Sequence, residues 1–294
     1  MSSIIRSRSS LADYINVLKP KETSLLVYIG ACTAVVAAAV TQISFPTPVF
    51  ILTVIAIALG SAGANGLTNY LDRDVDARMK RTCARALPSG RIHPPEKALP
   101  LIVGCMLGAL ILSWILSPVC FLIGLVGFLA SGIWRKSVTC TYFGIIAGSA
   151  PVLIGWYAVS GHTTIDLLPV MFFCLIAAWT PLHVWTLMLA NRKDYEEAGL
   201  HYFPLSWKDS NVIKVLAVLS VLLSFVSILI YLLPGKFHWI YLAVSSILSL
   251  IMILASIRLL LSPTSKNAWS VYKYTAFPYL GIIFTAMVID IWLL

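Results

Sequence analysis

Three of the chain's twelve acidic residues fall within five positions, at Asp72, Asp74 and Asp76, directly after an apolar run long enough to cross a membrane. An α-helix turns by about 100° per residue, so Asp72 and Asp76 share one face while Asp74 faces the opposite side. Two carboxylates one turn apart repel each other, and burial at a membrane boundary raises the free-energy cost of holding both charges there. A divalent cation that bridges them would offset this repulsion. Mg²⁺ prefers one or two carboxylates with substrate phosphate oxygens. The spacing predicts a Mg²⁺ site; the alternative is a solvated acidic helix end.

The surroundings of this pair favour an anionic substrate. The amide and hydroxyl side chains of Asn65, Thr68 and Asn69 lie on the same helical arc as the two aspartates. Four cations then follow within twelve residues, at Lys80, Arg81, Arg85 and Arg91. Cations beside a metal site are suited to the oxygens of a diphosphate. Membrane topology alone is the other explanation of a basic loop.

A second polar region follows the sixth apolar run. His183 lies inside that run, and on one continuous helix Asn191, Asp194 and Glu197 fall within about 80° of it. Asp194 then lies roughly 16 Å from His183 along the axis, close to the membrane boundary. An ionisable residue inside a span is either a hydrogen-bonded interior group or a functional one. The further polar candidates of this region are Arg192, Lys193 and Tyr195.

The composition is that of a polytopic membrane protein. Hydrophobic residues make up 59% of the 294 positions and charged residues 11%, and the mean hydropathy is +0.90. These values exclude a soluble domain. Apolar runs of roughly spanning length occur at residues 23–44, 47–71, 98–117, 119–134, 138–160, 167–190, 215–233, 237–257 and 274–294. The chain is therefore predicted to be all-α, with nine transmembrane helices in a bundle around a central cavity.

The distribution of charge predicts the orientation. With nine spans and a cytoplasmic N-terminus, 20 of the 21 lysines and arginines fall on the cytoplasmic side, and Lys236 is the exception. The positive-inside rule then places the C-terminus outside, in a multi-pass protein of the cell membrane. The net charge of +9 reflects topology and anion binding, so no nucleic acid partner is expected. The six cysteines are scattered and predict neither a disulfide framework nor a zinc site.

The layout suggests two related halves. Residues 1–21 are predicted to form a cytoplasmic N-terminal segment, and residues 22–294 the transmembrane domain. Both polar regions follow a span, and these two spans are four helices apart, which places them on the same topological phase. We expect two four-helix halves and one additional helix.

At these two regions the sequence resembles the UbiA superfamily of intramembrane prenyltransferases, and in particular its haem-farnesylating branch. The first match runs from Asp72 to Thr82 and continues at Arg85, Leu87, Pro88, Ser89 and Gly90; the second comprises Pro151, Gly155, Trp156, Trp179-Thr180-Pro181, His183, Asp194-Tyr195, Ala198-Gly199 and Pro204. The resemblance extends from about Lys19 to the last span. Thr68 stands where the superfamily has asparagine, and Asn65 and Asn69 on the same face are able to supply the amide.

The resemblance implies transfer of a farnesyl group from farnesyl diphosphate to a vinyl group of haem B, giving haem O. It implies Mg²⁺ as the cofactor, held by Asp72 and Asp76, with Asp194 serving a second metal or the far side of the diphosphate. Lys80, Arg81, Arg85 and Lys193 would neutralise charge, and His183 would contact the haem. The remaining substrate-binding candidates are Asn65, Thr68, Asn69, Asn191, Arg192 and Tyr195. The implied partners are the lipid bilayer, the two substrates, and a downstream haem A synthase or terminal oxidase.

Two alternatives stay open at this point. A related prenyltransferase with a quinone-precursor or lipid acceptor would not need His183. Two related halves with polar groups inside spans would also suit a membrane transporter. A transporter does not, however, need paired aspartates beside a cluster of cations. A structural subunit without activity is the least favoured interpretation.

Overall fold

The computed structural model describes residues 9–133, 139–233 and 236–293. Within these ranges the regular structure is helical and contains no strand. Four of the basic residues that the sequence analysis counted on the cytoplasmic side lie outside the described residues: Arg6, Arg8, Arg135 and Lys136.

The long helices coincide with the nine apolar runs of the sequence. They are α2 (Pro20–Val40), α3 (Thr47–Leu71), α5 (Leu99–Leu116), α6 (Pro118–Ile133), α7 (Cys140–Ser160), α8 (Leu167–Ala190), α10 (Asp209–Tyr231), α11 (Trp239–Leu261) and α13 (Phe277–Leu293). The short helices are α1 (Leu11–Val17), α4 (Arg73–Asp76), α9 (Arg192–Glu197) and α12 (Ser265–Thr275), with a 3-10 turn at Pro95–Ala98. Eight stretches in the described part of the chain are long and apolar enough to span a membrane, with Ser265–Leu293 counted as one, and α6 is shorter.

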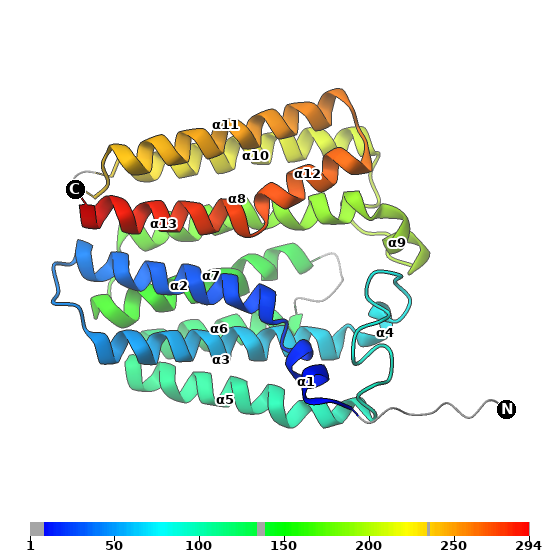
Figure 1. Cartoon of the computed structure of the whole chain (residues 1–294), viewed down its shortest axis with the longest axis horizontal. Helices are drawn as coiled ribbons and strands as arrows, with labels where there is room; N and C mark the ends of the chain where they lie inside the picture. Colours follow the sequence, from blue (N-terminus) through cyan, green and yellow to red (C-terminus); the bar gives the residue numbers. More distant parts are fainter. Residues whose placement is uncertain (1–8, 134–138, 234–235, 294) are drawn as a thin grey trace.

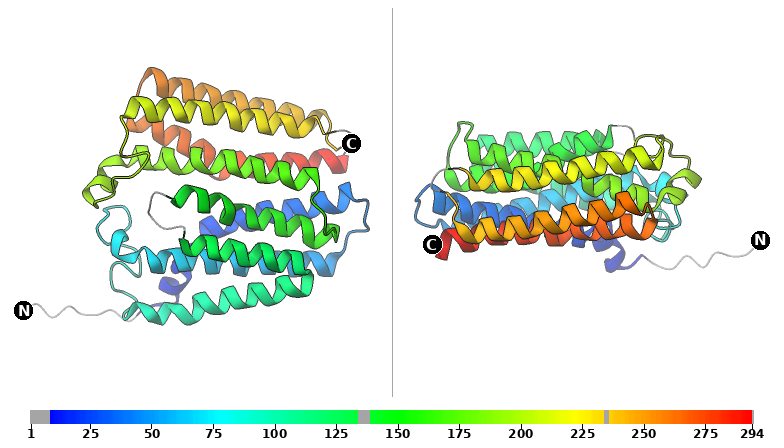
Figure 2. Two further views of the ribbon diagram at one scale, coloured as in Figure 1. Left: turned by 180° about the vertical axis from the view of Figure 1, so that it is seen from behind. Right: turned by 90° about the horizontal axis from the view of Figure 1, so that it is seen from above.

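The long helices lie side by side along a common direction (Figure 1). The segments α1, α4 and α9 gather at one end of the bundle, and α13 ends at the opposite end (Figure 1). The same bundle is seen from behind and from above in Figure 2. The most extensive helix pairs are α3 with α5, α2 with α7, and α10 with α11. Because α4 follows α3 and α9 follows α8, the C-terminal ends of α3 and α8 lie at the end of the bundle that carries these short helices.

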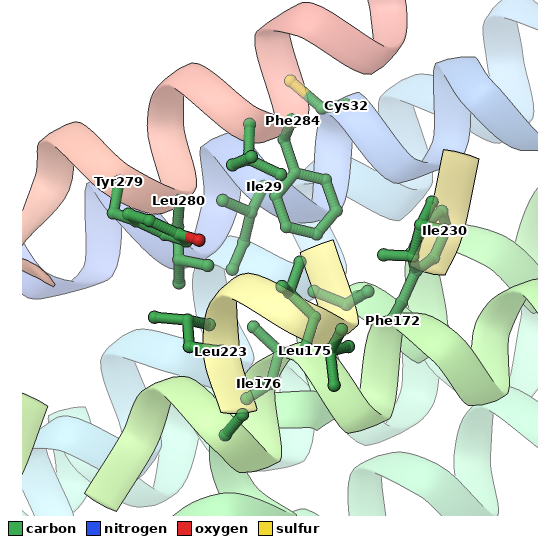
Figure 3. Close-up of a cluster of buried hydrophobic side chains, with 14 of the residues drawn as sticks. Ile29, Cys32, Phe172, Leu175, Ile176, Leu223, Ile230, Tyr279, Leu280 and Phe284 are labelled. Carbon is green, nitrogen blue, oxygen red and sulfur yellow. The ribbon is translucent and has the colours of Figure 1, made fainter. Parts of the chain in front are cut away.

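A buried apolar cluster joins the middle of the bundle. Ile29 of α2, Phe172 of α8, and Tyr279 and Phe284 of α13 are at most 2% exposed and face one another (Figure 3). Lipid is as apolar as these side chains, so close packing rather than transfer from water favours their contact. The helices α2 and α7 approach each other closely where a Cβ on Gly155 would collide with the Gly30 carbonyl. Glycine is required there because the two backbones touch.

The outer surface of the bundle is apolar. Large exposed hydrophobic side chains include Leu107 and Ile111 of α5, Leu129 of α6, Val218 of α10 and Leu250 of α11, each at least half exposed. Apolar patches of this extent are not tolerated on a soluble monomer. They form the lipid-facing surface of a multi-pass membrane protein.

Candidate functional site

A cavity of about 370 Å³ opens at the end of the bundle that carries α1, α4 and α9. Polar and charged side chains line its mouth, whereas small and apolar ones from α3, α5, α6 and α7 line its interior. The polar group comprises Lys19, Glu22, Asn65, Thr68, Asn69, Asp72, Asp76, Arg81, Arg85 and Tyr195. The apolar group includes Gly60, Ala64, Ala109, Gly124, Gly127, Gly148 and Ile154. Such a space suits an amphiphile with an anionic head and a slender apolar tail.

The aspartate pair lies along this cavity. The helix α3 ends at Leu71, but the amide of Asp72 still donates to Thr68 O at 2.9 Å and that of Asp76 to Asp72 O at 2.8 Å. The helical path thus continues through α4, and both carboxylates line the cavity. The side chain of Asp74 is 83% exposed and is not part of the lining.

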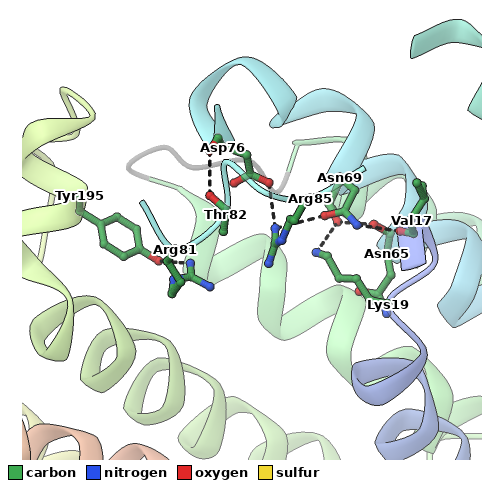
Figure 4. A network of polar contacts seen from close by, with 10 residues as sticks. Val17, Lys19, Asn65, Asn69, Asp76, Arg81, Thr82, Arg85 and Tyr195 are labelled. Carbon is green, nitrogen blue, oxygen red and sulfur yellow. Dashed lines mark hydrogen bonds and ion pairs between the residues drawn. The ribbon is translucent and has the colours of Figure 1, made fainter. Parts of the chain in front are cut away.

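Arg85 holds the buried member of the pair. The Asp76 side chain is 1% exposed, and its Oδ2 accepts from Arg85 Nη1 at 2.8 Å (Figure 4). The same Nη1 lies 3.3 Å from Asn69 Oδ1, and Thr82 Oγ1 donates to the Asp76 backbone carbonyl at 3.0 Å. A buried carboxylate needs such a partner because an uncompensated charge there is very costly. The basic loop is therefore folded back onto the end of α3.

Lys19, which the sequence analysis counted only among the cytoplasmic basic residues, also faces this site. Lys19 precedes α2 in the left-handed backbone region, with φ of 50°, and its Nζ donates to Thr68 Oγ1 at 3.2 Å (Figure 4). Burial, together with the charge of Arg85, lowers the pKa of Lys19 to about 8. The sequence signal for this position was the pair Lys19-Pro20. Proline is favoured in the first turn of a helix, so Pro20 begins α2 and places Lys19 directly before it, at the cavity mouth.

The predicted amide residues connect the N-terminal segment to the site. Asn69 Nδ2 donates to Val17 O at 2.7 Å, and Asn65 Nδ2 donates to Thr23 Oγ1 at 3.1 Å. These bonds occupy one donor of each amide and hold α1 and the start of α2 against α3. Asn65, Thr68 and Asn69 all line the cavity.

The expectation of one continuous polar helix face from His183 to Asp194 is wrong. The helix α8 ends at Ala190, and Asn191 leaves helical geometry with φ of −117° and ψ of 24° before α9 starts at Arg192. His183 lines the 370 Å³ cavity, whereas Asp194 borders a second cavity of about 630 Å³. The predicted 16 Å axial separation therefore does not apply.

The side chain of Asp194 binds backbone amides of the basic loop. Its Oδ1 accepts from the Lys80 amide at 2.6 Å and its Oδ2 from the Arg81 amide at 3.2 Å. Arg81 lines both cavities, and its Nη2 lies 3.5 Å from the Tyr195 hydroxyl (Figure 4). Lys80 is exposed and pairs with Glu197 at 2.7 Å, and this contact raises the pKa of Lys80.

The predicted residues Asn191, Arg192 and Lys193 are not part of the lining of the 370 Å³ cavity. Arg192 donates to the carbonyls of Pro204, Leu205 and Trp207 and pairs with Asp209 at 2.8 Å, so its guanidinium fixes the 198–208 loop. Asn191 Nδ2 donates to the Leu187 carbonyl at 2.8 Å. Lys193 is exposed on the border of the second cavity.

His183 is held between two aromatic rings. Trp179 stacks on one side, with centroids 4.6 Å apart and an interplanar angle of 13°, and Tyr272 of α12 stacks with centroids 4.7 Å apart at 27°. The imidazole Nδ1 lies 3.1 Å from Thr275 Oγ1. Sequence reasoning did not find Tyr272 and Thr275, because 89 or more positions separate them from His183 and no local pattern connects the two segments.

The residues present fit a divalent cation that is completed by its substrate. The described residues contain no group of three or more His, Cys, Asp and Glu side chains placed to hold a metal without other ligands. They do offer two cavity-lining carboxylates at Asp72 and Asp76 beside amide oxygens. Mg²⁺ typically takes one or two carboxylates and completes its octahedron with phosphate oxygens and water.

Comparison with known proteins gives matches over almost the whole chain. The model of the UbiA prenyltransferase family matches residues 28–281. A protoheme IX farnesyltransferase from Desulforudis audaxviator is 33% identical over 97% of this chain and 90% of that protein. A protein of the same name from Granulibacter bethesdensis is 32% identical over 99% of this chain and 94% of that protein.

Solved structures share the arrangement of helices. A digeranylgeranylglyceryl phosphate synthase superimposes with a TM-score of 0.77 at 18% identity, over 97% of this chain and 99% of that one. A UbiA homolog from Archaeoglobus fulgidus bound to GPP and Mg²⁺ gives 0.61 at 14% identity, over 94% and 99%. At these identities the likeness concerns the fold alone. The sequence matches, with which this shared fold agrees, show that this chain belongs to the UbiA prenyltransferase family.

Proposed function

We propose that this protein transfers the farnesyl group of farnesyl diphosphate to a vinyl group of haem B, giving haem O and diphosphate. The observation that carries the proposal is one cavity with two different ends. Its polar mouth combines a carboxylate pair with the cations Lys19, Arg81 and Arg85, and its interior combines small apolar side chains with a histidine. The near-full-length similarity to protoheme IX farnesyltransferases supports haem as the acceptor.

Asp72 and Asp76 would hold Mg²⁺ against the diphosphate. When bound, the ion supplies Lewis-acid stabilisation of the negative charge on the leaving group. Arg85 fixes the orientation of Asp76, with Nη1 at 2.8 Å from Oδ2. Asp194 acts on the diphosphate through the Lys80 and Arg81 backbone that it positions, and a second cation there would have to replace those two amides.

Cations at the mouth stabilise the departing diphosphate. Arg81, Arg85 and Lys19 line the cavity, so their charges lie where negative charge grows as the C–O bond breaks. Lys80 is exposed and adds long-range attraction. Arg192 serves the loop, and we assign it no contact with substrate.

The interior controls the allylic cation. The apolar lining from α3, α5, α6 and α7 holds the prenyl chain and limits water around the cation until the vinyl carbon attacks it. A new C–C bond forms, and water then captures the resulting carbocation with loss of a proton. His183, beside Trp179 and Tyr272 on another side of the cavity, contacts the haem.

The same arrangement supports an orientation in the membrane. The cavity mouth and α1 lie at one end of the bundle, and α13 ends at the other (Figure 1). We place the mouth and the N-terminus in the cytoplasm, where the basic loops are. The apolar product is then released within the membrane, next to a downstream haem A synthase or terminal oxidase.

The test is product identification. The purified chain in lipid nanodiscs, with isotope-labelled farnesyl diphosphate, Mg²⁺ and haem B, should yield labelled haem O by mass spectrometry and lose that product with EDTA. Parallel reactions offer a quinone precursor in place of haem. Prenylation of the quinone precursor with no haem O formed would overturn the acceptor, and the absence of any prenylated product would overturn the activity.

A further inference from the structure

Thr275 makes two hydrogen bonds that together restrict the protonation of His183. Its hydroxyl donates to the Tyr272 carbonyl at 2.9 Å and lies 3.1 Å from His183 Nδ1. A hydroxyl has one proton but two lone pairs. Both bonds form at once only if the proton goes to the carbonyl and the oxygen accepts from a protonated Nδ1. The imidazole is then the Nδ1–H tautomer, with an unprotonated Nε2.

The second contact distinguishes Thr275 from buried threonines that make only the local bond. Thr33, for example, is 0% exposed and donates from its hydroxyl to the Ile29 carbonyl at 2.8 Å, a common pattern in helices. Thr275 is equally buried and makes the corresponding local bond, but its free lone pair meets the imidazole. The backbone carbonyl of Thr275 also accepts from Trp179 Nε1 at 2.5 Å. One residue thus holds both the histidine and the indole stacked on it.

We infer that the nitrogen that this tautomer leaves unprotonated faces the cavity. No residue in the described part of the chain gives His183 Nε2 a hydrogen bond, and Nε2 is not among the fully buried side-chain atoms without a partner, so it retains accessible surface. His183 lines the cavity. The stacking of Trp179 and Tyr272 occupies the faces of the ring, so a flat acceptor reaches its edge. An in-plane lone pair at that edge is the group that binds haem iron.

We propose that Thr275 is a positioning residue for the acceptor: it fixes His183 as the Nδ1–H tautomer so that Nε2 ligates the iron of bound haem B. This inference rests on the proposed function. Histidines that bind metals typically donate their other ring N–H to an oxygen, and that bond sets the ring orientation and its basicity. Here the oxygen comes from the last turn of α12, next to the break at Ala276 where α13 begins.

The first test uses Thr275→Val, which keeps the shape and removes the acceptor, with Thr275→Ser retaining it. We expect Thr275→Val to weaken haem B binding by about 10-fold or more. It should also lower the iron–histidine stretching frequency of the ferrous complex in resonance Raman spectra, while KM for farnesyl diphosphate is unchanged. Thr275→Ser should retain both properties. Thr33→Val is the matched control for loss of a buried hydroxyl, with both properties unchanged.

A second measurement needs no Thr275 variant. Nitrogen NMR of ¹⁵N-histidine-labelled protein, with the His183 signals assigned from a His183→Gln sample, should show a protonated Nδ1 and an unprotonated Nε2. The opposite tautomer would overturn the inference, as would unchanged haem affinity and stretching frequency in Thr275→Val. If the unmodified protein makes haem O and only these readouts fail, the role of Thr275 is wrong. If it makes no haem O, the proposed function is wrong.

Discussion

Replacing Asp76 by asparagine separates the chemical role of its charge from its structural role. The side chain is 1% exposed and accepts from Arg85 Nη1 at 2.8 Å. Asparagine has the same shape and keeps an oxygen for Arg85, so the ion pair becomes a charged–neutral hydrogen bond. That exchange costs on the order of 1–2 kcal/mol of stability, below the roughly 3–5 kcal/mol of breaking a fully buried pair, because the Arg85 side chain that loses its counter-charge is partly exposed to solvent.

The expected loss of activity is larger than this loss of stability. Removing one preorganised stabilising group typically costs on the order of 10³ in turnover, or about 4 kcal/mol of activation free energy. Asp76→Asn should therefore lose nearly all haem O formation while its unfolding temperature falls by only about 2–8 °C. Asp72→Asn should lose turnover in the same way, since that carboxylate also lines the cavity.

Asp74→Asn is the matched control, because its side chain is 83% exposed and lies outside the cavity lining. The assay combines steady-state haem O formation over a Mg²⁺ titration with thermal unfolding in the same detergent. Equal turnover of the variants at positions 72, 74 and 76 would refute the reasoning from the helix face. A Mg²⁺ dependence that is the same in Asp76→Asn and the unmodified chain would refute the metal assignment.

Three further predictions concern the acceptor, the pH dependence and the topology. His183→Ala should weaken haem B binding and change the Soret spectrum, while Mg²⁺-dependent binding of farnesyl diphosphate is kept; unchanged haem binding would reduce His183 to a packing residue. Lys19 is a cation below its lowered pKa of about 8 and is neutral above it, so affinity for farnesyl diphosphate should fall as pH rises through about 8. Calorimetric titration across that range should show this step in the unmodified protein and not in Lys19→Met, and a step retained in Lys19→Met would assign it to another group. Reporters fused before α1 and after Leu294 should read opposite sides of the membrane, with the N-terminal one cytoplasmic, and two cytoplasmic readings would mean a miscounted span.

Helix periodicity predicted much of the site because the relevant contacts are local. The placement of Asp72 and Asp76 along one cavity, with Asp74 outside it, follows from a rotation of about 100° per residue. The nine apolar runs likewise predicted the long helices, because spanning length and hydropathy are properties of each segment alone. Local pattern is sufficient where one helix carries all the residues concerned.

The same reasoning failed at Asn191, where no proline or glycine marks the end of α8. A periodic extrapolation continues through such a position, and here it joined His183 to Asp194 wrongly. At the last span a signal was present. Pro278 has no N–H for a continuous helix and is tolerated in a first turn, and α13 begins one residue before it, at Phe277.

The break at Asn191 and the break before α13 together explain why the two ends of the cavity are built differently. Because α9 turns away, Asp194 holds the basic loop from the side, and the anion end is assembled from α3, α4 and the Lys19 segment. Because α12 ends at Thr275, its last turn offers a hydroxyl and a carbonyl to His183 and Trp179. In a continuous helix the Thr275 carbonyl would accept a bond within the helix instead of the bond from Trp179. In the proposed reaction the diphosphate and the acceptor would thus be held by separate segments that line one cavity.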